Sequence, residues 1–233
     1  MNDRSAQPLA IRDAASILVV NRNAARGPSV LMGQRGKAAA FMPSKYVFPG
    51  GAVDPEDGTA RLGGALATRT AARLGAEPRS PSEVTPHAIA AAALRELAEE
   101  TGLLTGSQGL APEGWHRYGA AGIAPDPSNL IYMFRAITPP RLSRRFDARF
   151  LLLDAGHIHG DAEDFSAACD ELSHLHWVPI REARELDLPF ITEVVLAELG
   201  ALLRASGGGP LNEPAEVPFF DNRDEVPRFS RIT

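Results

Sequence analysis

The sequence contains a single cysteine, Cys169, among its 233 residues. It therefore cannot form an intrachain disulfide, and this low cysteine usage favours a reducing compartment, so we expect a cytoplasmic protein. No segment approaches the roughly 20 apolar residues of a membrane helix, and residues 1–10 lack the apolar core of a signal peptide. From these absences we expect neither membrane insertion nor secretion.

Long basic runs are also missing, and the formal net charge is −5. Proteins that bind nucleic acid through its phosphates present a basic face, so we expect no nucleic-acid partner. The glycine-rich phosphate loop that ends in lysine and the Gly-x-Gly-x-x-Gly dinucleotide pattern are absent too. A small phosphate-bearing ligand remains compatible with the composition, because a bound metal ion can supply positive charge.

The pattern of apolar residues predicts strands and helices in alternation. Short runs rich in Ile and Val, bounded by polar residues, predict strands at 15–21, 29–33, 45–48, 130–137, 150–153 and 175–179. Helical spacing predicts helices at 88–100 and 192–205, and an Ala- and Arg-rich stretch could add one at 60–74. Strands mixed with two or three helices predict an α/β layered domain with a mixed sheet.

We expect a single domain over residues 1–205. Residues 54–84 differ in composition from their surroundings and are too few for a core of their own, so we interpret them as an insertion within that domain. Ser206–Pro210 contains three consecutive glycines. This segment predicts a linker, followed by an extended tail, so that residues 206–233 lie outside the domain.

The segment that points most directly to chemistry is Arg95-Glu96-Leu97-Ala98-Glu99-Glu100-Thr101-Gly102-Leu103. With 3.6 residues per helical turn, its three glutamates fall within a sector of roughly 100° on one face. Carboxylates crowded in this way repel each other unless a cation lies among them, and hard oxygen ligands suit Mg²⁺ or Mn²⁺. Arg95 lies one turn before Glu99 and can pair with it. The alternative is a solvated acidic face with an arginine partner.

This segment resembles the second half of the Nudix box, and Phe48-Pro49-Gly50-Gly51 resembles its glycine-led first half. The resemblance implies a Nudix-type α/β/α sandwich in which a strand, a loop and a helix hold metal ions against a diphosphate. It makes Glu99 and Glu100 metal ligands and Glu96 a further ligand or a base. The carbonyl of Gly51 or its neighbour would complete the ligand shell, and Arg95 would orient a glutamate.

The chain departs from the family pattern in one place. The family usually has five residues between its glycine and a glutamate, and seven more before the Arg-Glu pair. Counted back from Arg95, the glutamate position holds His87 and the glycine position holds Pro81. The box is therefore predicted to be split by the insertion at 54–84, with the role of the missing glutamate in doubt.

An insertion of this kind resembles the coenzyme A and acyl-CoA diphosphatases of peroxisomes and their bacterial relatives. That branch has a signature of two arginines and a glycine before the Phe-Pro-Gly-Gly segment. This chain retains the first arginine, Arg35, which is predicted to contact a phosphate, but lacks the second arginine and the glycine. Phe48 is predicted to lie beside the substrate as well. Glu171, six residues before Trp177, matches a loop glutamate that reaches the metals in several members. The alternatives are a surface arginine for Arg35 and an exposed loop acid for Glu171.

The sequence thus predicts a metal-dependent enzyme that hydrolyses the diphosphate linkage of a nucleoside diphosphate joined to another group, with coenzyme A or acyl-CoA as one substrate. ADP-ribose, a dinucleotide or a nucleotide sugar is the alternative, and a nucleotide-binding regulatory domain without catalysis is the alternative of another class. Either Glu96 or Glu171 could be the general base. The resemblance also leaves a homodimer open.

Overall fold

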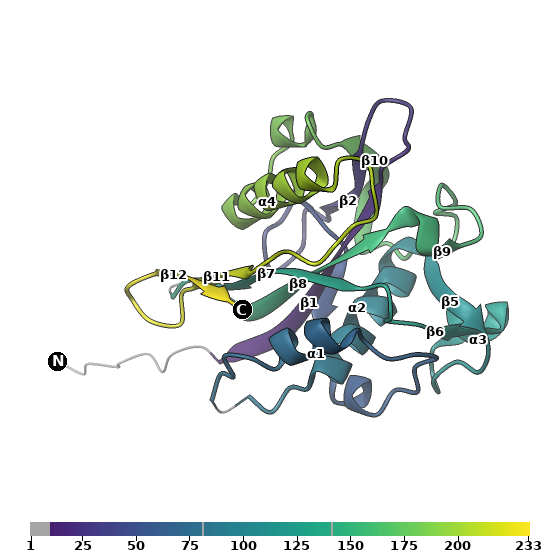
Figure 1. Ribbon diagram of the computed structural model, residues 1–233, viewed down its shortest axis with the longest axis horizontal. Coiled ribbons are helices and arrows are strands. Elements are labelled where there is room, and N and C mark those ends of the chain that lie inside the picture. Colours follow the sequence, from purple (N-terminus) through teal and green to yellow (C-terminus); the bar gives the residue numbers. More distant parts are fainter. Residues whose placement is uncertain (1–9, 81, 141) are drawn as a thin grey trace.

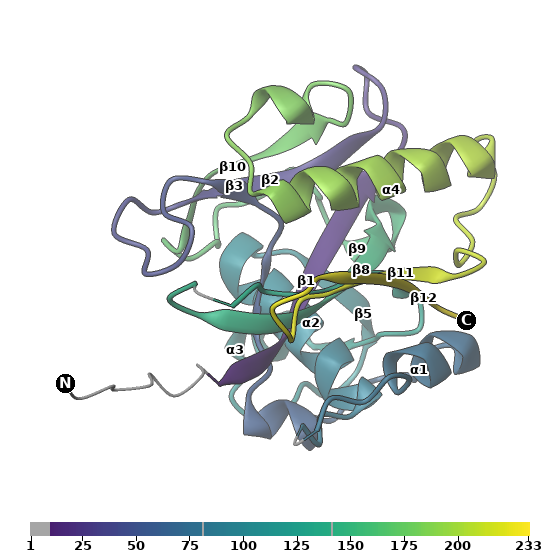
Figure 2. The same ribbon diagram turned by 90° about the vertical axis from the view of Figure 1, so that its left-hand side faces the viewer.

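The computed structural model describes residues 10–80, 82–140 and 142–233. Within these residues the chain forms an α/β/α sandwich, in which a mixed sheet separates one helix from the other helices (Figure 1). The predicted α/β fold with a mixed sheet is thereby confirmed. Seen from the side, α4 (Phe190–Ser206) crosses one face of the sheet, while α1 (Thr68–Leu74) lies on the opposite side (Figure 2).

The large sheet has nine strands in the described part of the chain, ordered β10-β2-β1-β8-β7-β11-β12, with β3 paired to β2 and β4 paired to β1. Their bounds are β1 Ile11–Asn21, β2 Ser29–Arg35, β3 Tyr46–Val47, β4 Gly50–Ala52, β7 Ile131–Ile137, β8 Arg145–Asp154, β10 Leu172–Pro179, β11 Val217–Asp221 and β12 Arg228–Ile232. The pairs β1–β8 and β7–β11 are parallel and the others are antiparallel, which makes the sheet mixed. A smaller sheet has the order β6-β5-β9, with bounds Ile123–Pro125, Leu104–Gln108 and Ile158–His159.

The helix α2 (Pro86–Thr101) begins and ends where local signals predict it. The side chain of Thr85 accepts a hydrogen bond from the backbone of Ala88 at 3.1 Å, and proline takes the first helical position. Gly102 closes the helix in the left-handed region, at φ 79°. Because both ends are fixed, the register of the carboxylates along this helix is fixed as well.

The helical segments other than α2 and α4 are shorter, and one differs from its prediction. The helix expected at 60–74 forms only as α1, because the backbone N–H of Gly63 instead donates to the carbonyl of Pro125 at 2.7 Å. The remaining segments are α3 (His116–Ala121) and the 3₁₀ turns η1 (Pro55–Gly58), η2 (Ala155–His157) and η3 (Ala183–Glu185).

Each face of the sheet packs against its own layer. On one face, α2 contributes the apolar residues Ile89, Leu94 and Leu97 to a buried cluster. On the other face, α4 contributes Val195 and Leu199 to a second cluster. The helices therefore bury one stripe each, which leaves the polar face of α2 free to carry its carboxylates.

The C-terminal segment does not lie outside the domain as the sequence predicts. Residues 217–221 pair in parallel with β7, and residues 228–232 form the edge strand beside them. Prolines are rare in sheet interiors, and Pro218 lowers the expectation of a strand here. The partner strand lies some eighty residues earlier, so local sequence does not show the pairing.

A buried ionic cluster attaches residues 76–79 to the sheet. Arg135 on β7 donates two hydrogen bonds of 2.8 Å to Asp147 on β8 and further bonds to the carbonyls of Ala76 and Glu77. Arg79 bridges Asp147 and Asp13 at 3.1 and 2.9 Å. Burial raises the pKa of the Asp147 carboxyl, but the hydrogen bond from Arg135 and the neighbouring guanidinium charges outweigh it, so the pKa lies below its usual range.

None of the helices in the described ranges is long and apolar enough to cross a membrane.

Candidate active site

The carboxylate end of α2 lies against the glycine-led loop that the sequence singles out. The backbone N–H of Gly50 donates to Oε2 of Glu100 at 2.7 Å, and Glu100 is buried. The same loop forms β4 and pairs with residues 14–16 of β1. The two halves of the predicted box, about fifty residues apart in sequence, therefore meet in space.

At both glycines, neighbouring groups lie so close that a side chain would collide with them. Gly50 has φ 153°, and a methyl group there would lie 2.4 Å from the carbonyl oxygen of Ala15. A methyl group at Gly51 would lie 2.2 Å from Oε1 of Glu96. Atoms do not approach this closely without moving, so glycine at 51 makes room for the Glu96 carboxylate beside the loop backbone.

Arg95 connects the loop, the helix and the segment that follows the loop. Its guanidinium lies 2.9 Å from Glu96 and 3.3 Å from Glu99, and it donates to the carbonyl of Ala52 at 3.1 Å. The predicted pair between Arg95 and Glu99 is therefore present. Burial lowers the pKa of Arg95, but the hydrogen bond to Asp57 and the charges of Glu96 and Asp57 outweigh it, so the pKa lies above its usual value.

Asp57 is the acid that the backward count from Arg95 misses. It receives hydrogen bonds from Nε and Nη2 of Arg95, each 3.0 Å long, and it is buried. Five residues separate Gly51 from Asp57, so Asp57 occupies the position of the glutamate in the Nudix box. His87, found by counting backward, is exposed and lies 2.9 Å from the carbonyl oxygen of Ala60. The extra residues therefore come after Asp57, and the forward count would have found it.

The electrostatics of the site disfavour ionised carboxylates in the absence of a cation. Burial raises the pKa of Glu96 to about 7, against the opposing effect of Arg95 and with the support of Glu99 and Glu171. Burial also raises the pKa of Glu100 to about 8, although the Gly50 N–H partly offsets it. Crowded acids of this kind are typical of sites that bind positive charge.

Arg35 and Glu171, both predicted site residues, lie close together. Arg35 ends β2 and Leu172 begins β10, and these two residues pair in the sheet. As a result Nη2 of Arg35 lies 3.3 Å from Oε1 of Glu171. Both residues line the cavity that also includes Gly50 and Gly51, so the guanidinium and the loop carboxylate border the same space as the glycine loop.

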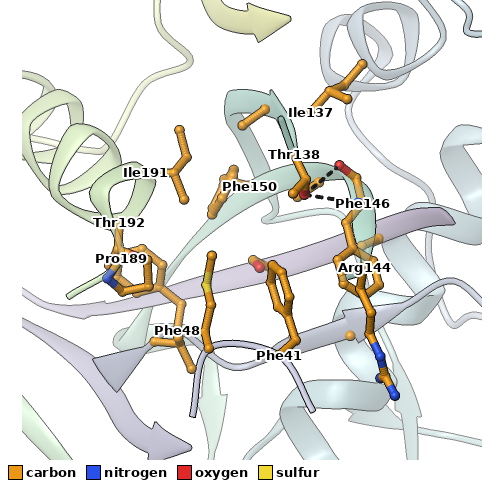
Figure 3. Close-up of a pocket in the computed structure, with 18 of the residues that line it drawn as sticks. Phe41, Phe48, Ile137, Thr138, Arg144, Phe146, Phe150, Pro189, Ile191 and Thr192 are labelled. Atoms are coloured by element: carbon orange, nitrogen blue, oxygen red, sulfur yellow. Dashed lines mark hydrogen bonds between the residues drawn. The ribbon is translucent and has the colours of Figure 1, made fainter. Parts of the chain in front are cut away.

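The cavity has a volume of about 390 Å³ and lies on the α4 side of the sheet. Phe48, which the sequence places beside the substrate, lines it and packs edge-on against Phe150 with the ring centres 6.4 Å apart. Figure 3 shows Phe41 and Ile191 entering the cavity from opposite sides, from the loop before β3 and from α4. Sequence reasoning missed the α4 wall, because no local motif marks it.

The donor chemistry fits a hard divalent cation. The candidate ligands are the carboxylates of Glu96, Glu99, Glu100 and Glu171 and the carbonyl of Gly51, all of them oxygen donors. Within the described residues, no group of three or more His, Cys, Asp or Glu side chains is already arranged to hold a metal ion. The guanidinium of Arg95 lies within 3.3 Å of Glu96 and Glu99, and that of Arg35 lies 3.3 Å from Glu171, so these carboxylates are paired with arginines.

Comparisons with known proteins support the Nudix hydrolase family for this chain. A curated relative, the putative Nudix hydrolase 7 of Caenorhabditis elegans, is 31% identical over 191 residues, which cover 73% of this chain and 52% of the relative. The chain thus spans about half the length of the curated relative that it matches. No protein-family model matches the chain.

One solved structure supports the same fold, and a second is less similar. The crystal structure of a NUDIX hydrolase from Alicyclobacillus acidocaldarius has a TM-score of 0.59 and 27% identity, and the match covers 88% of this chain and 99% of that one. The NUDIX domain of Shewanella oneidensis NrtR, solved in complex with ADP-ribose, has a TM-score of 0.46 and 13% identity over 83% of this chain and 89% of that one. The second likeness is too low to carry an inference about a ligand here. The coenzyme A branch stays a prediction from the sequence.

Proposed function

We propose that this protein hydrolyses the diphosphate linkage of a nucleoside diphosphate joined to another group, with coenzyme A or an acyl-CoA as substrate. One observation carries the proposal: the buried Glu100 accepts from the Gly50 backbone at 2.7 Å, while Gly51 leaves room for Glu96. This contact joins the two half-motifs into one acidic site next to a cavity of ligand size.

Glu96, Glu99, Glu100 and the Gly51 carbonyl would hold Mg²⁺ or Mn²⁺, and Glu171 would add a further ligand or act as base. The bound ions would neutralise the diphosphate oxygens and acidify the attacking water. Because three carboxylates crowd one helix face, the ions would also relieve the repulsion among them.

The protein's own side chains orient the reacting groups. Arg95, held by Asp57, fixes Glu96 and Glu99 on the polar face of α2. Arg35, paired with Glu171, can turn its planar fork to a phosphate oxygen of the substrate. Glu96 or Glu171 would take the proton of the attacking water. A coenzyme A substrate would give an adenosine bisphosphate and phosphopantetheine. A homodimer and a cytoplasmic location remain predictions from the sequence.

Product analysis by mass spectrometry tests this proposal. The purified protein is incubated with coenzyme A, an acyl-CoA, ADP-ribose, NADH and a nucleotide sugar, each with Mg²⁺, with Mn²⁺ or with a chelator. We expect metal-dependent cleavage between the two phosphates, fastest for a coenzyme A compound. If ADP-ribose were cleaved fastest, the proposed diphosphate hydrolysis would stand, but ADP-ribose would replace coenzyme A as the proposed substrate.

A variant pair assigns the carboxylates. Glu99→Gln combined with Glu100→Gln should lower turnover by more than about a hundredfold, because both oxygen ligands lose their charge. Glu83→Gln, at an exposed glutamate in the loop before α2, should leave turnover unchanged. Nucleotide binding with no cleavage of any compound by the unmodified protein would favour a regulatory domain instead.

A further inference from the structure

The cavity beside the acidic site has mostly apolar walls. The sheet supplies Ala136, Ala148 and Phe150, and the loop before β3 supplies Phe41 and Met42. The start of α4 and strand β11 close the far side with Pro189, Phe190, Ile191 and Phe220. An occupant of this space would exchange water for carbon atoms over most of its surface.

The charged side chains that line the cavity are Arg12, Arg35, Arg144 and Glu171, and few of the neutral polar side chains are free to bind a ligand. Thr138 donates to the carbonyl of Phe146 at 3.2 Å and accepts from its N–H at 3.0 Å. Asn222 is buried and donates to the carbonyl of Ile137 at 3.0 Å. Among the described lining residues, Ser16 and Thr192 are the neutral polar side chains without a side-chain hydrogen bond to the protein.

This scarcity of free neutral polar groups in the walls distinguishes between a nucleobase and an alkyl chain as the group that binds in the cavity. A nucleobase carries several donors and acceptors, and each one loses a hydrogen bond to water unless the wall replaces it. An alkyl chain has no such groups and gains from every methylene that it buries. The walls therefore favour a chain over a base.

Some of the apolar residues that line the cavity extend onto the surface. Phe190 is 68% exposed and Leu142 is 41% exposed, although both line the cavity. The Phe190 ring lies 6.5 Å from that of Phe220, which lies 6.3 Å from Phe229. Large apolar side chains exposed together beside a cavity indicate a surface that a ligand covers.

From these walls and these exposed apolar residues, we propose that the cavity binds an apolar chain attached to the diphosphate of the substrate, and that Phe190 and Leu142 contact the chain where it leaves the cavity. The inference rests on the proposed diphosphate hydrolysis, since the acidic site defines the end of the cavity where the diphosphate lies. It does not rest on coenzyme A as the substrate, because pantetheine carries amides and a hydroxyl that these walls do not match. It names Phe190 and Leu142 as residues that determine specificity without taking part in hydrolysis.

A homologous series of substrates tests this proposal: the ethyl, hexyl and dodecyl esters of ADP, assayed with Mg²⁺ or Mn²⁺, with ADP-ribose as a compound that lacks a chain. We expect kcat/KM to rise with chain length, by at most about fourfold for each methylene that becomes buried. The rise should end once the chain extends beyond the cavity.

Phe190→Ser should lower kcat/KM for the dodecyl ester by about tenfold, mainly through KM, because it removes contact with the chain. Activity on the ethyl ester should not change, and Leu142→Ser should act in the same direction as Phe190→Ser. Phe229→Ser is the matched control, since Phe229 is 54% exposed and lies in the same aromatic row but does not line the cavity. Its kinetics should match those of the unmodified protein.

Equal kcat/KM values for the three esters would overturn the inference, and so would equal effects of Phe190→Ser and Phe229→Ser. An equal loss on ADP-ribose and on the dodecyl ester in Phe190→Ser would also overturn it, because the cavity would then hold the nucleotide. In each case, continued metal-dependent cleavage would leave the proposed function standing. If no diphosphate were cleaved with either metal, the proposed function itself would fail.

Discussion

Replacement of Asp57 by asparagine should weaken both the fold and the activity. The side chain is 1% exposed and accepts two hydrogen bonds from Arg95, each 3.0 Å long. Asparagine has nearly the same shape, but it removes the negative charge and places an amide donor where Arg95 also presents donors. The variant therefore tests the charge of this contact without creating a cavity.

The expected loss in the free energy of unfolding depends on which partners Arg95 retains. Breaking a buried ion pair costs about 3–5 kcal/mol when the surviving charge is left unpaired. Here Arg95 keeps Glu96, Glu99 and the Ala52 carbonyl, so we expect a smaller loss, of about 2 kcal/mol. Once released on one side, Arg95 no longer fixes the two glutamates, and kcat should fall by about tenfold to a hundredfold.

Urea unfolding and steady-state kinetics on the same preparations measure the two effects. Asp54→Asn is the matched control, because Asp54 is 50% exposed and lies 3.5 Å from the same guanidinium. It should cost less than about 1 kcal/mol and leave kcat nearly unchanged. Asp57→Glu, which keeps the charge, should recover part of both losses. Equal effects of Asp54→Asn and Asp57→Asn would show that Asp57 does not position Arg95.

Two further substitutions follow from contacts in the fold. Gly51→Ala should lower kcat by about tenfold or more with little change in the free energy of unfolding, because the methyl group displaces the flexible end of Glu96. Gly119→Ala, where a methyl group meets no atom within 4 Å, serves as its control. Normal turnover in Gly51→Ala would show that the position of Glu96 beside the loop does not matter for catalysis. Asp147→Asn should destabilise the protein by about 3 kcal/mol at neutral pH, since three buried arginines lose their shared anion. The folded-state pKa of Asp147 is lowered, so its contribution is complete above the usual carboxyl value and disappears as the pH falls through the folded value. Urea midpoints measured from neutral pH downward should therefore converge for the variant and the unmodified protein in acid, whereas Asp187→Asn, at an exposed pair with Lys45, should follow the unmodified protein throughout.

The elements that sequence alone predicted are those with local signals. The helix α2 has a capping threonine and a closing glycine, and the strands near residues 15–21 and 130–137 are apolar runs. The first half of β8 was missed because Arg145, Asp147 and Arg149 alternate along it. These charges are buried against partners from distant segments, which a hydropathy pattern cannot reveal.

The same distinction applies to the candidate site. Helical periodicity was enough to group Glu96, Glu99 and Glu100, because their relative positions depend on one helix. Asp57 and the cavity wall at Phe190 depend on contacts between segments far apart in sequence. Those contacts arise from the packing of α4 and β11 on the sheet and of η1 on α2. Counting forward from Gly51 would have located Asp57, whereas no short motif marks Phe190.

The contact between Asp57 and Arg95 joins residues that are 38 positions apart in sequence. In the usual Nudix box the corresponding glutamate and arginine are eight positions apart. Closing a longer loop costs conformational entropy, but only as the logarithm of its length, so this extension costs about 1.5 kcal/mol. The ion pair and the packing of α2 can offset such an amount. Segments of very different length can therefore join the two halves of this acidic site, and evolution can vary the surface between them while leaving the carboxylates where they are.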